Sequence, residues 1–445
     1  MKRVTRTDPV DTPDGATGPA QVTRGSLALG LSVLFTAVGG LLFWLIAARL
    51  EPAATVGRSQ ALFQVLAFVN YVANVGLPVA LARYVGRSES RMANWMIDLR
   101  AVLAVVTTGV FLVAAGSTDL VEPLWSRGYV FGCAVFVFVG VGMALAVLAE
   151  MRLMTLRMWT GVVSRSALAA LLRLPLVIPL ALGWVSVDHA SLWLFVIATV
   201  PIAVTGYAAV LYLRLTRDRD RGARYHVRPP EGARHVVRFA GVNWLGLLAT
   251  QGPIFAVPVV VAFTVDSATN APFFVAWSFG AIAFLIPQVI GQVTLSEASQ
   301  EGHIDRKLSH ALKLALLATC AASVVAQLFS GVLASVYGAE YGDLAVHTPL
   351  LVGASIAWSY TSLALTAARI TDRIAELLIL SVFFLCATMI PTLVLTPGLG
   401  ADAATWSWLG GNAAAALLAA VMHYHWHLGA PASDPLDAPA PKVDR

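Results

Sequence analysis

The sequence predicts an all-α integral membrane protein with about twelve transmembrane helices arranged in two six-helix lobes. Hydrophobic residues make up 58% of the 445 residues and charged residues only 12%, a balance that favours the lipid bilayer as the solvent. The apolar residues gather into about twelve runs, each near the roughly 20 residues that a helix needs to cross the hydrocarbon. The 30 Lys and Arg residues fall mainly in alternate connections between these runs. Because this pattern marks membrane topology, the formal charge of +5 does not predict a nucleic-acid partner.

The predicted spans follow one another with short connections. The segments 1–24 and 429–445 are rich in Pro, Gly and Asp and are predicted to be disordered cytoplasmic tails. The first apolar run is too long for the core of a signal peptide, so we expect it to remain as an anchor. The approximate limits of the spans are 26–48, 60–82, 98–116, 129–149, 166–186, 191–213, 239–264, 273–296, 311–336, 349–368, 376–396 and 405–427.

The connections alternate between basic and acidic character along the chain. Each predicted inner connection contains basic residues, whereas the outer connections are mostly acidic or neutral. Their only Lys or Arg residues are Arg49, Arg58 and Arg127. Since basic connections stay in the cytoplasm, both termini are predicted to be cytoplasmic. The inner connections are 83–91, 150–165, 214–238, 301–307 and 369–373.

A basic linker, 214–238, divides the chain into an N-terminal lobe (25–213) and a C-terminal lobe (239–428). Six helices in each lobe give both the same orientation, which is the parallel repeat of several transporter folds. The arginines of this linker are expected to meet anionic membrane lipids. Pro78 and Pro287 lie at similar depth in the second helix of each lobe, where they act either as gates or as static kinks.

Two segments carry a resemblance to a known family. The segment 25–87 has a Gly-rich first helix that ends in Ala48-Arg49-Leu50, and a second helix that closes with the Gly76-Leu77 and Arg83-Tyr84 pairs. The segment FFVAWSFGAIAFLIPQVIGQVTLSEAS (273–299) has a mid-helix proline and a final Glu-Ala-Ser. Both resemble bacterial polysaccharide transporters of the O-antigen flippase type. That family belongs to the multidrug/oligosaccharidyl-lipid/polysaccharide (MOP) exporter superfamily.

The resemblance implies a MATE-like fold, the MOP flippase fold, with two lobes that face a central cavity and open alternately to either side. It implies export of polyprenyl-diphosphate-linked oligosaccharide or polysaccharide precursors from the inner to the outer leaflet of the bacterial plasma membrane. No bond is made or broken, so no enzyme activity and no cofactor are expected; glycan-assembly enzymes are candidate partners of a monomeric transporter. Since the chain has no P-loop motif, an H⁺ or Na⁺ gradient or the membrane potential is expected to supply energy.

Two other functions stay open. The first is a cation-coupled multidrug antiporter on the same scaffold, which requires a buried acid in the cavity. Related drug exporters often place one in the first or seventh helix, but 26–48 and 239–264 contain no charged residue. Lipid II flippases usually carry arginines in the first helix, whereas here only Arg49 lies at its end. The second is a membrane glycan polymerase or glycosyltransferase, which usually needs a longer outer loop than any predicted here.

Amides and aromatic side chains within the spans form the predicted substrate cavity. Asn70 and Asn74 share one helical face, and Gln288 and Gln292 repeat their spacing. Buried amides that faced lipid would be costly, so they are expected to point inward; the alternative is interhelical hydrogen bonding without substrate contact. The predicted lining residues are Trp44, Asn70, Asn74, Arg173, Asn243, Trp244, Gln251, Trp277, Gln288 and Gln292.

Charged residues supply the remaining candidates. Arg173 lies inside a span and is expected either to bind the diphosphate or to snorkel towards the surface. Arg83 and Arg100 are predicted at the inner mouth, as phosphate contacts or as topology markers. The coupling-ion candidates are Asp98, Glu150 and Glu297, each of which has the alternative of pairing with a nearby arginine. No metal site is predicted, because the three histidines at 423, 425 and 427 fit an interfacial belt better.

Overall fold

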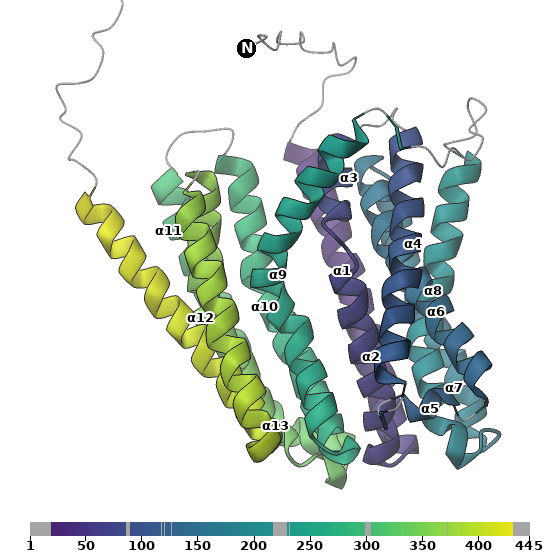
Figure 1. The fold of residues 1–445 in the computed structure, drawn as a ribbon. Helices are drawn as coiled ribbons and strands as arrows, with labels where there is room; N and C mark the ends of the chain where they lie inside the picture. Colours follow the sequence, from purple (N-terminus) through teal and green to yellow (C-terminus); the bar gives the residue numbers. More distant parts are fainter. Residues whose placement is uncertain are drawn as a thin grey trace, which may run out of the picture.

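The computed structural model describes residues 19–85, 90–116, 118–119, 121–125, 127–216, 229–230, 232–298, 304–371 and 373–429. Within these ranges long helices run side by side between two ends of a bundle (Figure 1). Ten of the described helices are long and apolar enough to cross a membrane. The predicted fold class, an all-α membrane protein, is therefore confirmed.

The N-terminal lobe packs α1 against α7 and α6 against α8, with α4 beside α6. The predicted span 60–82 is not one continuous helix, because the chain leaves helical geometry between α2 and α3. The short α5 lies in a connection rather than in a span. The helices are α1 (Pro19–Leu50), α2 (Ala53–Val72), α3 (Leu77–Tyr84), α4 (Ser90–Ala115), α5 (Glu122–Trp125), α6 (Tyr129–Thr155), α7 (Trp159–Ala181) and α8 (Val187–Thr216).

The C-terminal lobe is built around α12, which packs against α10, α11 and α13. Gly400 has a non-helical backbone (φ 69°, ψ −155°), so α13 consists of two helices joined at a kink, which match the last two predicted spans. The helices are α9 (Ala233–Thr264), α10 (Ser267–Ala298), α11 (Ile304–Tyr337), the 3₁₀ turn η1 (Ala339–Tyr341), α12 (Leu344–Ile370) and α13 (Ile374–Gly429).

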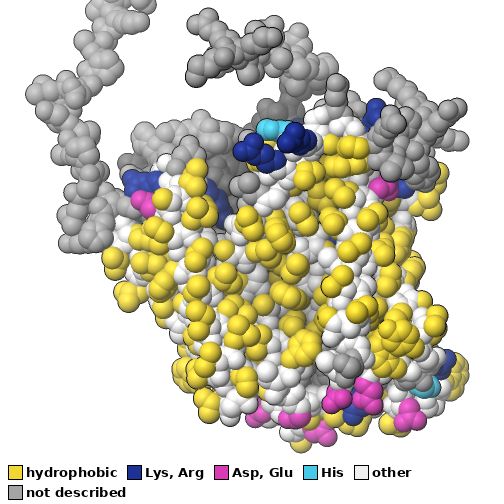
Figure 2. Space-filling model, in the orientation of Figure 1, with side chains coloured by type: hydrophobic (Ala, Val, Ile, Leu, Met, Phe, Trp, Pro, Cys, Tyr) yellow, Lys and Arg dark blue, Asp and Glu magenta, His cyan; other side chains and the backbone are white. Residues whose placement is uncertain are grey.

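The two ends of the bundle differ in charge. We call the end where α1 begins and α13 finishes the basic end, because arginine and lysine side chains gather there (upper part of Figure 2). The opposite end, the acidic end, carries most of the visible carboxylates. Between the two ends Figure 2 shows mainly apolar side chains. Large apolar residues of the long helices are exposed, among them Val113 of α4 (84%) and Leu317 of α11 (71%). This banding is what a bilayer around the bundle requires.

The predicted tails and linker lie largely outside the described residues. Most of the parts that the structure describes are helical: α1 begins at Pro19, α8 continues to Thr216 and α9 begins at Ala233. The helices therefore extend further towards the basic end than the predicted spans, because hydropathy locates the apolar part of a helix and not its polar first and last turns.

Candidate functional site

Helix α2 connects the two lobes at the acidic end by crossing α10. At the crossing point Gly57 has no side chain, and a Cβ atom there would overlap the carbonyl oxygen of Ser267. Asn270 Nδ2 donates a hydrogen bond of 3.0 Å to the carbonyl oxygen of Gly57. Asp266 accepts hydrogen bonds from Thr269, which lower the pKa of this carboxyl group and fix the first turn of α10. The lobes are therefore in backbone contact at this end.

Towards the basic end the same segment of chain crosses α9. Helix α2 ends at Val72, and Val75 and Gly76 adopt positive φ angles of 44° and 67° before α3 begins with Pro78 next to its first residue. A Cβ atom at Gly76 would overlap the carbonyl oxygen of Ala240 in α9. Only glycine combines this left-handed conformation with such a close approach. The break in the second span therefore lies directly against the other lobe.

Helix α9 in turn packs against both lobes. Its first half joins the N-terminal lobe, where Phe239 packs edge-on against Tyr84 with ring centroids 5.0 Å apart. Its second half, with Val257 and Val261, belongs to the core of the C-terminal lobe. In the middle, the Tyr71 hydroxyl donates a hydrogen bond of 2.7 Å to the carbonyl oxygen of Leu247. Pro253 and Pro258 lie inside the helix, and each removes one backbone hydrogen bond.

Five of the predicted cavity residues lie on these crossing segments, and we call them the interlobe amide cluster. They are all half-buried, and none is ionisable. Gln288 Nε2 donates a hydrogen bond of 3.3 Å to Gln251 Oε1, which links α10 to α9. Asn74 Oδ1 and Trp244 Nε1 are buried and have no partner among the described residues. The cluster consists of Asn74, Asn243, Trp244, Gln251 and Gln288.

The other predicted cavity residues lie elsewhere. Trp44 is only 5% exposed and packs between Phe63 and Phe274, so it contributes to the apolar contact between the lobes at the acidic end. Trp277 lies in the core of the C-terminal lobe, 4.8 Å from Trp408 between ring centroids. The side chain of Gln292 lies outside the described residues.

Arg100 is buried rather than placed at the inner mouth. Helix α4 begins at Ser90, eight residues before the predicted span, so Arg100 lies deeper than expected and is 1% exposed. Its Nη2 atom donates hydrogen bonds to the Asn70 carbonyl oxygen (2.7 Å) and to Asn70 Oδ1 (3.2 Å). The Asn70 carbonyl is at the end of α2, where helical carbonyls lack backbone partners. Arg100 therefore caps the helix end beside the break in the second span.

Arg173 lies inside the N-terminal lobe and does not snorkel. It is 5% exposed in the middle of α7, and its Nη2 atom donates a hydrogen bond of 3.0 Å to the carbonyl oxygen of Ala198 in α8. The Nε atoms of Arg173 and Arg100, together with Nη1 of Arg100, are buried without a partner among the described residues. Two guanidinium groups thus lie in the interior without a carboxylate. The side chain of Arg83 lies outside the described residues.

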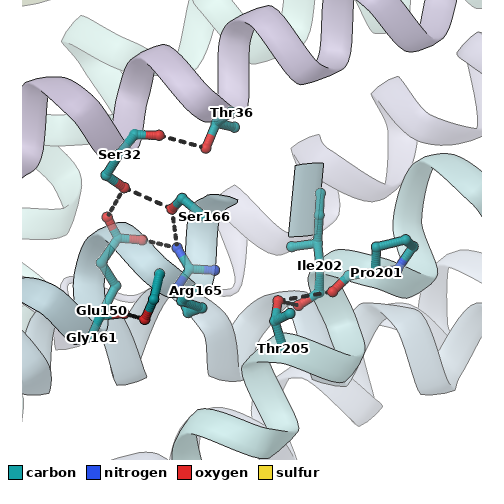
Figure 3. Close-up of polar contacts among 10 residues, drawn as sticks. Ser32, Thr36, Glu150, Gly161, Arg165, Ser166, Pro201, Ile202 and Thr205 are labelled. Atoms are coloured by element: carbon teal, nitrogen blue, oxygen red, sulfur yellow. Dashed lines mark hydrogen bonds and ion pairs between the residues drawn. The ribbon is translucent and has the colours of Figure 1, made fainter. Parts of the chain in front are cut away.

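The acidic candidates at the basic end are paired with arginines. Asp98 forms an ion pair with Arg214 at the end of α8. Glu150 pairs with Arg165, and its Oε1 atom accepts a hydrogen bond of 3.4 Å from Ser32 (Figure 3). Ser32 in turn lies 2.7 Å from the Ser166 hydroxyl, so this group links α1, α6 and α7. Both carboxylates thus pair with an arginine, and the side chain of Glu297 lies outside the described residues.

A second set of contacts between the lobes was not predicted, and we call it the acidic-end latch. Arg49, at the end of α1, donates hydrogen bonds to the carbonyl oxygens of Val336 (2.7 Å) and Ser335 (3.2 Å) at the end of α11. Glu340 Oε2 accepts a hydrogen bond of 2.6 Å from the Ala53 N–H at the start of α2. A cation at a helix C-terminus and an anion at a helix N-terminus are both favourable. The only sequence signal was a charged residue beside each predicted helix end.

The latch surrounds a cavity of about 360 Å³ lined by residues 48–52 and 337–341. Burial in this cavity raises the pKa of Glu51. The Tyr337 hydroxyl donates a hydrogen bond of 3.3 Å to the carbonyl oxygen of Leu41, which adds a third link between the lobes. At this end α1 and α2 are thus held against α10, α11 and η1.

Solved structures share this fold at low sequence identity. An outward-facing multidrug resistance MATE family transporter of the MOP superfamily superposes with a TM-score of 0.59 and 17% identity, over 91% of this chain and 95% of that chain. The lipid II flippase MurJ, in an inward closed conformation, gives a TM-score of 0.62 and 11% identity over 91% and 93%. The MATE multidrug transporter DinF-BH, in complex with R6G, gives 0.60 and 12% over 92% and 96%.

The comparisons establish the fold. No protein-family model matches the chain, and no curated protein matches it in sequence. The chain therefore has the fold shared by MATE transporters and MurJ within the MOP superfamily, and this fold carries both drug exporters and a lipid-linked precursor flippase. The substrate has to be argued from the chain's own residues.

Proposed function

We propose that this protein is a flippase that moves polyprenyl-diphosphate-linked oligosaccharide or polysaccharide precursors across the bacterial plasma membrane by alternating access. The observation that carries the proposal is the interlobe amide cluster, which is polar but uncharged and lies where α2 meets α9 and α10. A hydroxyl-rich, neutral glycan needs both donors and acceptors, and amide side chains supply both. Trp244 adds an aromatic face and an N–H group that has no partner among the described residues.

Arg100 and Arg173 are assigned an electrostatic role towards the diphosphate. Both are almost fully buried, and their nearest hydrogen-bond partners are neutral oxygens of Asn70 and Ala198. In a low-dielectric interior a positive charge without a carboxylate attracts an anion more strongly than it would in water. Arginine also matches the geometry of phosphate oxygens. The N-terminal lobe is thereby suited to a negatively charged head group.

The direction of transport follows from the two ends. The basic end is assigned to the cytoplasm by the positive-inside pattern, so substrate enters from the inner leaflet at that end. The acidic-end latch holds the lobes together on the opposite side. Opening the latch while the lobes close at the basic end completes translocation. The break beside Gly76 and the segment at Pro287 are the proposed pivots, because the first lies against α9 and the second precedes Gln288, which bonds to Gln251 of α9.

A cation-coupled multidrug antiporter is the second candidate, because MATE transporters share the fold. Binding of a cationic drug calls for a buried carboxylate. Among the residues whose side chains the structure describes, no Asp or Glu is in the buried class, and the buried groups of the spans that carry or can gain a positive charge are arginines and His347. This composition favours an anionic substrate over a cationic one.

The proposal is tested in proteoliposomes that contain a fluorescent polyprenyl-diphosphate oligosaccharide, with a head-group accessibility assay. Asn74→Leu and Gln288→Leu are expected to lower the flipping rate about fivefold each, the loss of roughly 1 kcal/mol of hydrogen bonding. Gln327→Leu is the matched control, because Gln327 is an amide on the exposed face of α11. Equal and small effects at all three positions would contradict the assignment of the amide cluster.

The alternatives are tested in the same vesicles. Wild-type protein that extrudes a cationic dye but leaves the glycan lipid in place would favour the drug antiporter. A lengthened glycan in the product, found by mass spectrometry with purified protein alone, would favour a polymerase or transferase. For the proposed flippase the mass of the lipid-linked glycan stays constant while its head group changes leaflet.

A further inference from the structure

His347 is a buried titratable group outside the sites described so far. It is 3% exposed in the first turn of α12, near the acidic end of the C-terminal lobe. Its Nδ1 atom lies 2.9 Å from the Thr405 hydroxyl, and its Nε2 atom lies 3.8 Å from Asp402 Oδ1. Asp402 is 72% exposed, so it links the buried ring to the solvent at this end. The three residues come from α12 and from the second arm of α13.

Burial opposes a charged imidazolium at His347, whereas the hydrogen-bond pattern around the ring favours the doubly protonated form. The Thr405 hydroxyl has one proton, and it lies within 3.1 Å of the Ala401 carbonyl oxygen as well as 2.9 Å from His347 Nδ1. If the hydroxyl donates to Ala401, Nδ1 must carry a proton. A neutral ring then presents a lone pair on Nε2 to a carboxylate. Protonation of Nε2 turns this repulsion into an attraction between imidazolium and Asp402.

Among the described residues, the charged groups that act on the ring are both acidic. Asp343 is the residue before α12, and Asp402 faces the ring from α13. From α10 the facing side chain is Phe273, which does not titrate and lies edge-on at 6.0 Å between ring centroids. Both carboxylates attract the imidazolium.

The segment of α10 that contacts His347 also holds the N-terminal lobe. Phe273 faces His347, whereas the next residue, Phe274, packs on Trp44 of α1 at 5.6 Å and on Phe63 of α2 at 6.0 Å. One turn earlier, Asn270 donates to the Gly57 carbonyl oxygen. A change in the packing of His347 thus reaches the lobe contact through one helical turn.

We infer that His347 is a proton-binding site whose occupancy controls the contact between the lobes at the acidic end. The proton enters from the acidic end through Asp402. Protonated His347 draws α12 and the second arm of α13 together and stabilises the arrangement in which α10 packs against α1 and α2. Loss of this proton weakens that packing contact and favours opening at the acidic end. The coupling to glycan export rests on the proposed function, whereas the proton-controlled contact does not.

The sign of the pH dependence follows directly. The closed arrangement is favoured at pH values at which His347 is protonated, and it loses this support as the pH rises and the proton leaves. The open population at the acidic end is therefore expected to grow about threefold or more between pH 5.5 and pH 8.

The test measures the distance between two spin labels in the full-length protein reconstituted in lipid vesicles without substrate. The labels are attached to cysteines introduced at Val187 in α8 and Val394 in α13, both of which are exposed, after the three native cysteines have been replaced by serine. The wild-type residue at 347 should give a pH-dependent shift between two distances. His347→Gln, which keeps hydrogen-bonding groups but cannot gain a charge, should abolish the shift.

His189→Gln is the matched control, because His189 is a half-buried histidine near the start of α8 at the same end. It should leave the pH dependence unchanged. If His347→Gln folds poorly, Asp402→Asn is measured instead, because this exposed carboxylate can be removed without disturbing the core. Asp402→Asn should move the midpoint of the pH-dependent distance change to lower pH by about half a unit. A wild-type protein with no pH-dependent distance, or a His347→Gln protein with an unchanged pH dependence, would overturn the inference.

A flipping assay with an imposed proton gradient then separates this inference from the proposed function. If a proton gradient stimulates flipping by the wild type but not by His347→Gln, and the two proteins flip equally fast without a gradient, the result supports both the flippase and the proton site. A pH-dependent distance change without any glycan movement would overturn the flippase and leave the proton site standing. Glycan movement that responds equally to the gradient in both proteins would overturn the proton site and leave the flippase standing.

Discussion

The two lobes differ in what they bury. The N-terminal lobe encloses arginine side chains, among them Arg100 and Arg173 at 1% and 5% exposure. The C-terminal lobe encloses stacked and tilted rings, with Trp408 at the centre, 4.8 Å from Trp277 and 5.0 Å from Phe284 between ring centroids. The interior of one lobe therefore contains positive charge, whereas the interior of the other is built around aromatic rings.

The difference has a local cause in the backbone. A buried guanidinium needs oxygen atoms, and the N-terminal lobe provides one where α2 ends: the Asn74 N–H bonds to the Tyr71 carbonyl, which leaves the Asn70 carbonyl for Arg100. In the C-terminal lobe α10 continues unbroken through its prolines, and its neighbours fill the space with aromatic rings. The break after α2 therefore provides the carbonyl oxygen that accommodates Arg100.

The largest expected effect comes from the aromatic interior. Trp408→Ala should lower the free energy of unfolding by about 3 kcal/mol, because it leaves a cavity among Trp277, Phe284 and Phe384. Thermal unfolding in detergent measures the change. Trp406→Ala is the control on the same helix, because Trp406 is 59% exposed and its removal should change the free energy of unfolding little. Equal losses at the two positions would show that the rings do not form a distinct core.

The second prediction concerns the charge in the N-terminal lobe. Arg173→Met should lower glycan flipping about tenfold and leave the unfolding temperature equal or higher, because a buried charge without a carboxylate adds little to stability. Flipping rates and thermal unfolding are measured on the same preparation. Arg234→Met, at an exposed position of the basic end, should change neither. Unchanged flipping by a folded Arg173→Met protein would remove Arg173 from the site.

The third prediction asks how firmly the two lobes are joined. Glu340→Gln keeps an acceptor for the Ala53 N–H but removes the negative charge at the start of α2, at a cost of about 0.5–1 kcal/mol. The population open at the acidic end should rise about two- to fivefold in the spin-label experiment. Glu122→Gln, an exposed carboxylate of α5, is the control. No change in the distance distribution would mean that the latch contributes nothing to closure.

The smallest effect is expected at the rim of the N-terminal lobe. Asp98→Asn breaks the ion pair with Arg214. Because the two side chains are 51% and 26% exposed, solvent screens their attraction, and the loss of stability should be less than about 0.5 kcal/mol. High salt should reduce the difference further. Thermal unfolding at two salt concentrations checks both points. A loss of flipping without loss of stability would instead return Asp98 to the list of coupling-ion candidates.

Several features were predictable because they depend on local sequence. The apolar runs and the sidedness of the basic residues predicted the spans and the two differently charged ends. The break at residues 73–76 was not predicted, since its sequence, Ala-Asn-Val-Gly, differs little from an ordinary apolar helix. Arg100 was misplaced because hydropathy does not show where a helix begins beyond its apolar part.

The sequence by itself determined that the helices lie in a lipid bilayer, the order in which they follow one another, and which end of the bundle is basic and which acidic. Each of these features follows from the composition of consecutive residues. Only the tertiary structure decided which polar side chains meet. Gln251 and Gln288, Arg49 and Val336, and His347 and Asp402 are all far apart in the chain, and their contacts follow from helix crossings. Those crossings are decided by close packing, such as that of Gly57 on Ser267, and one sequence does not display its packing.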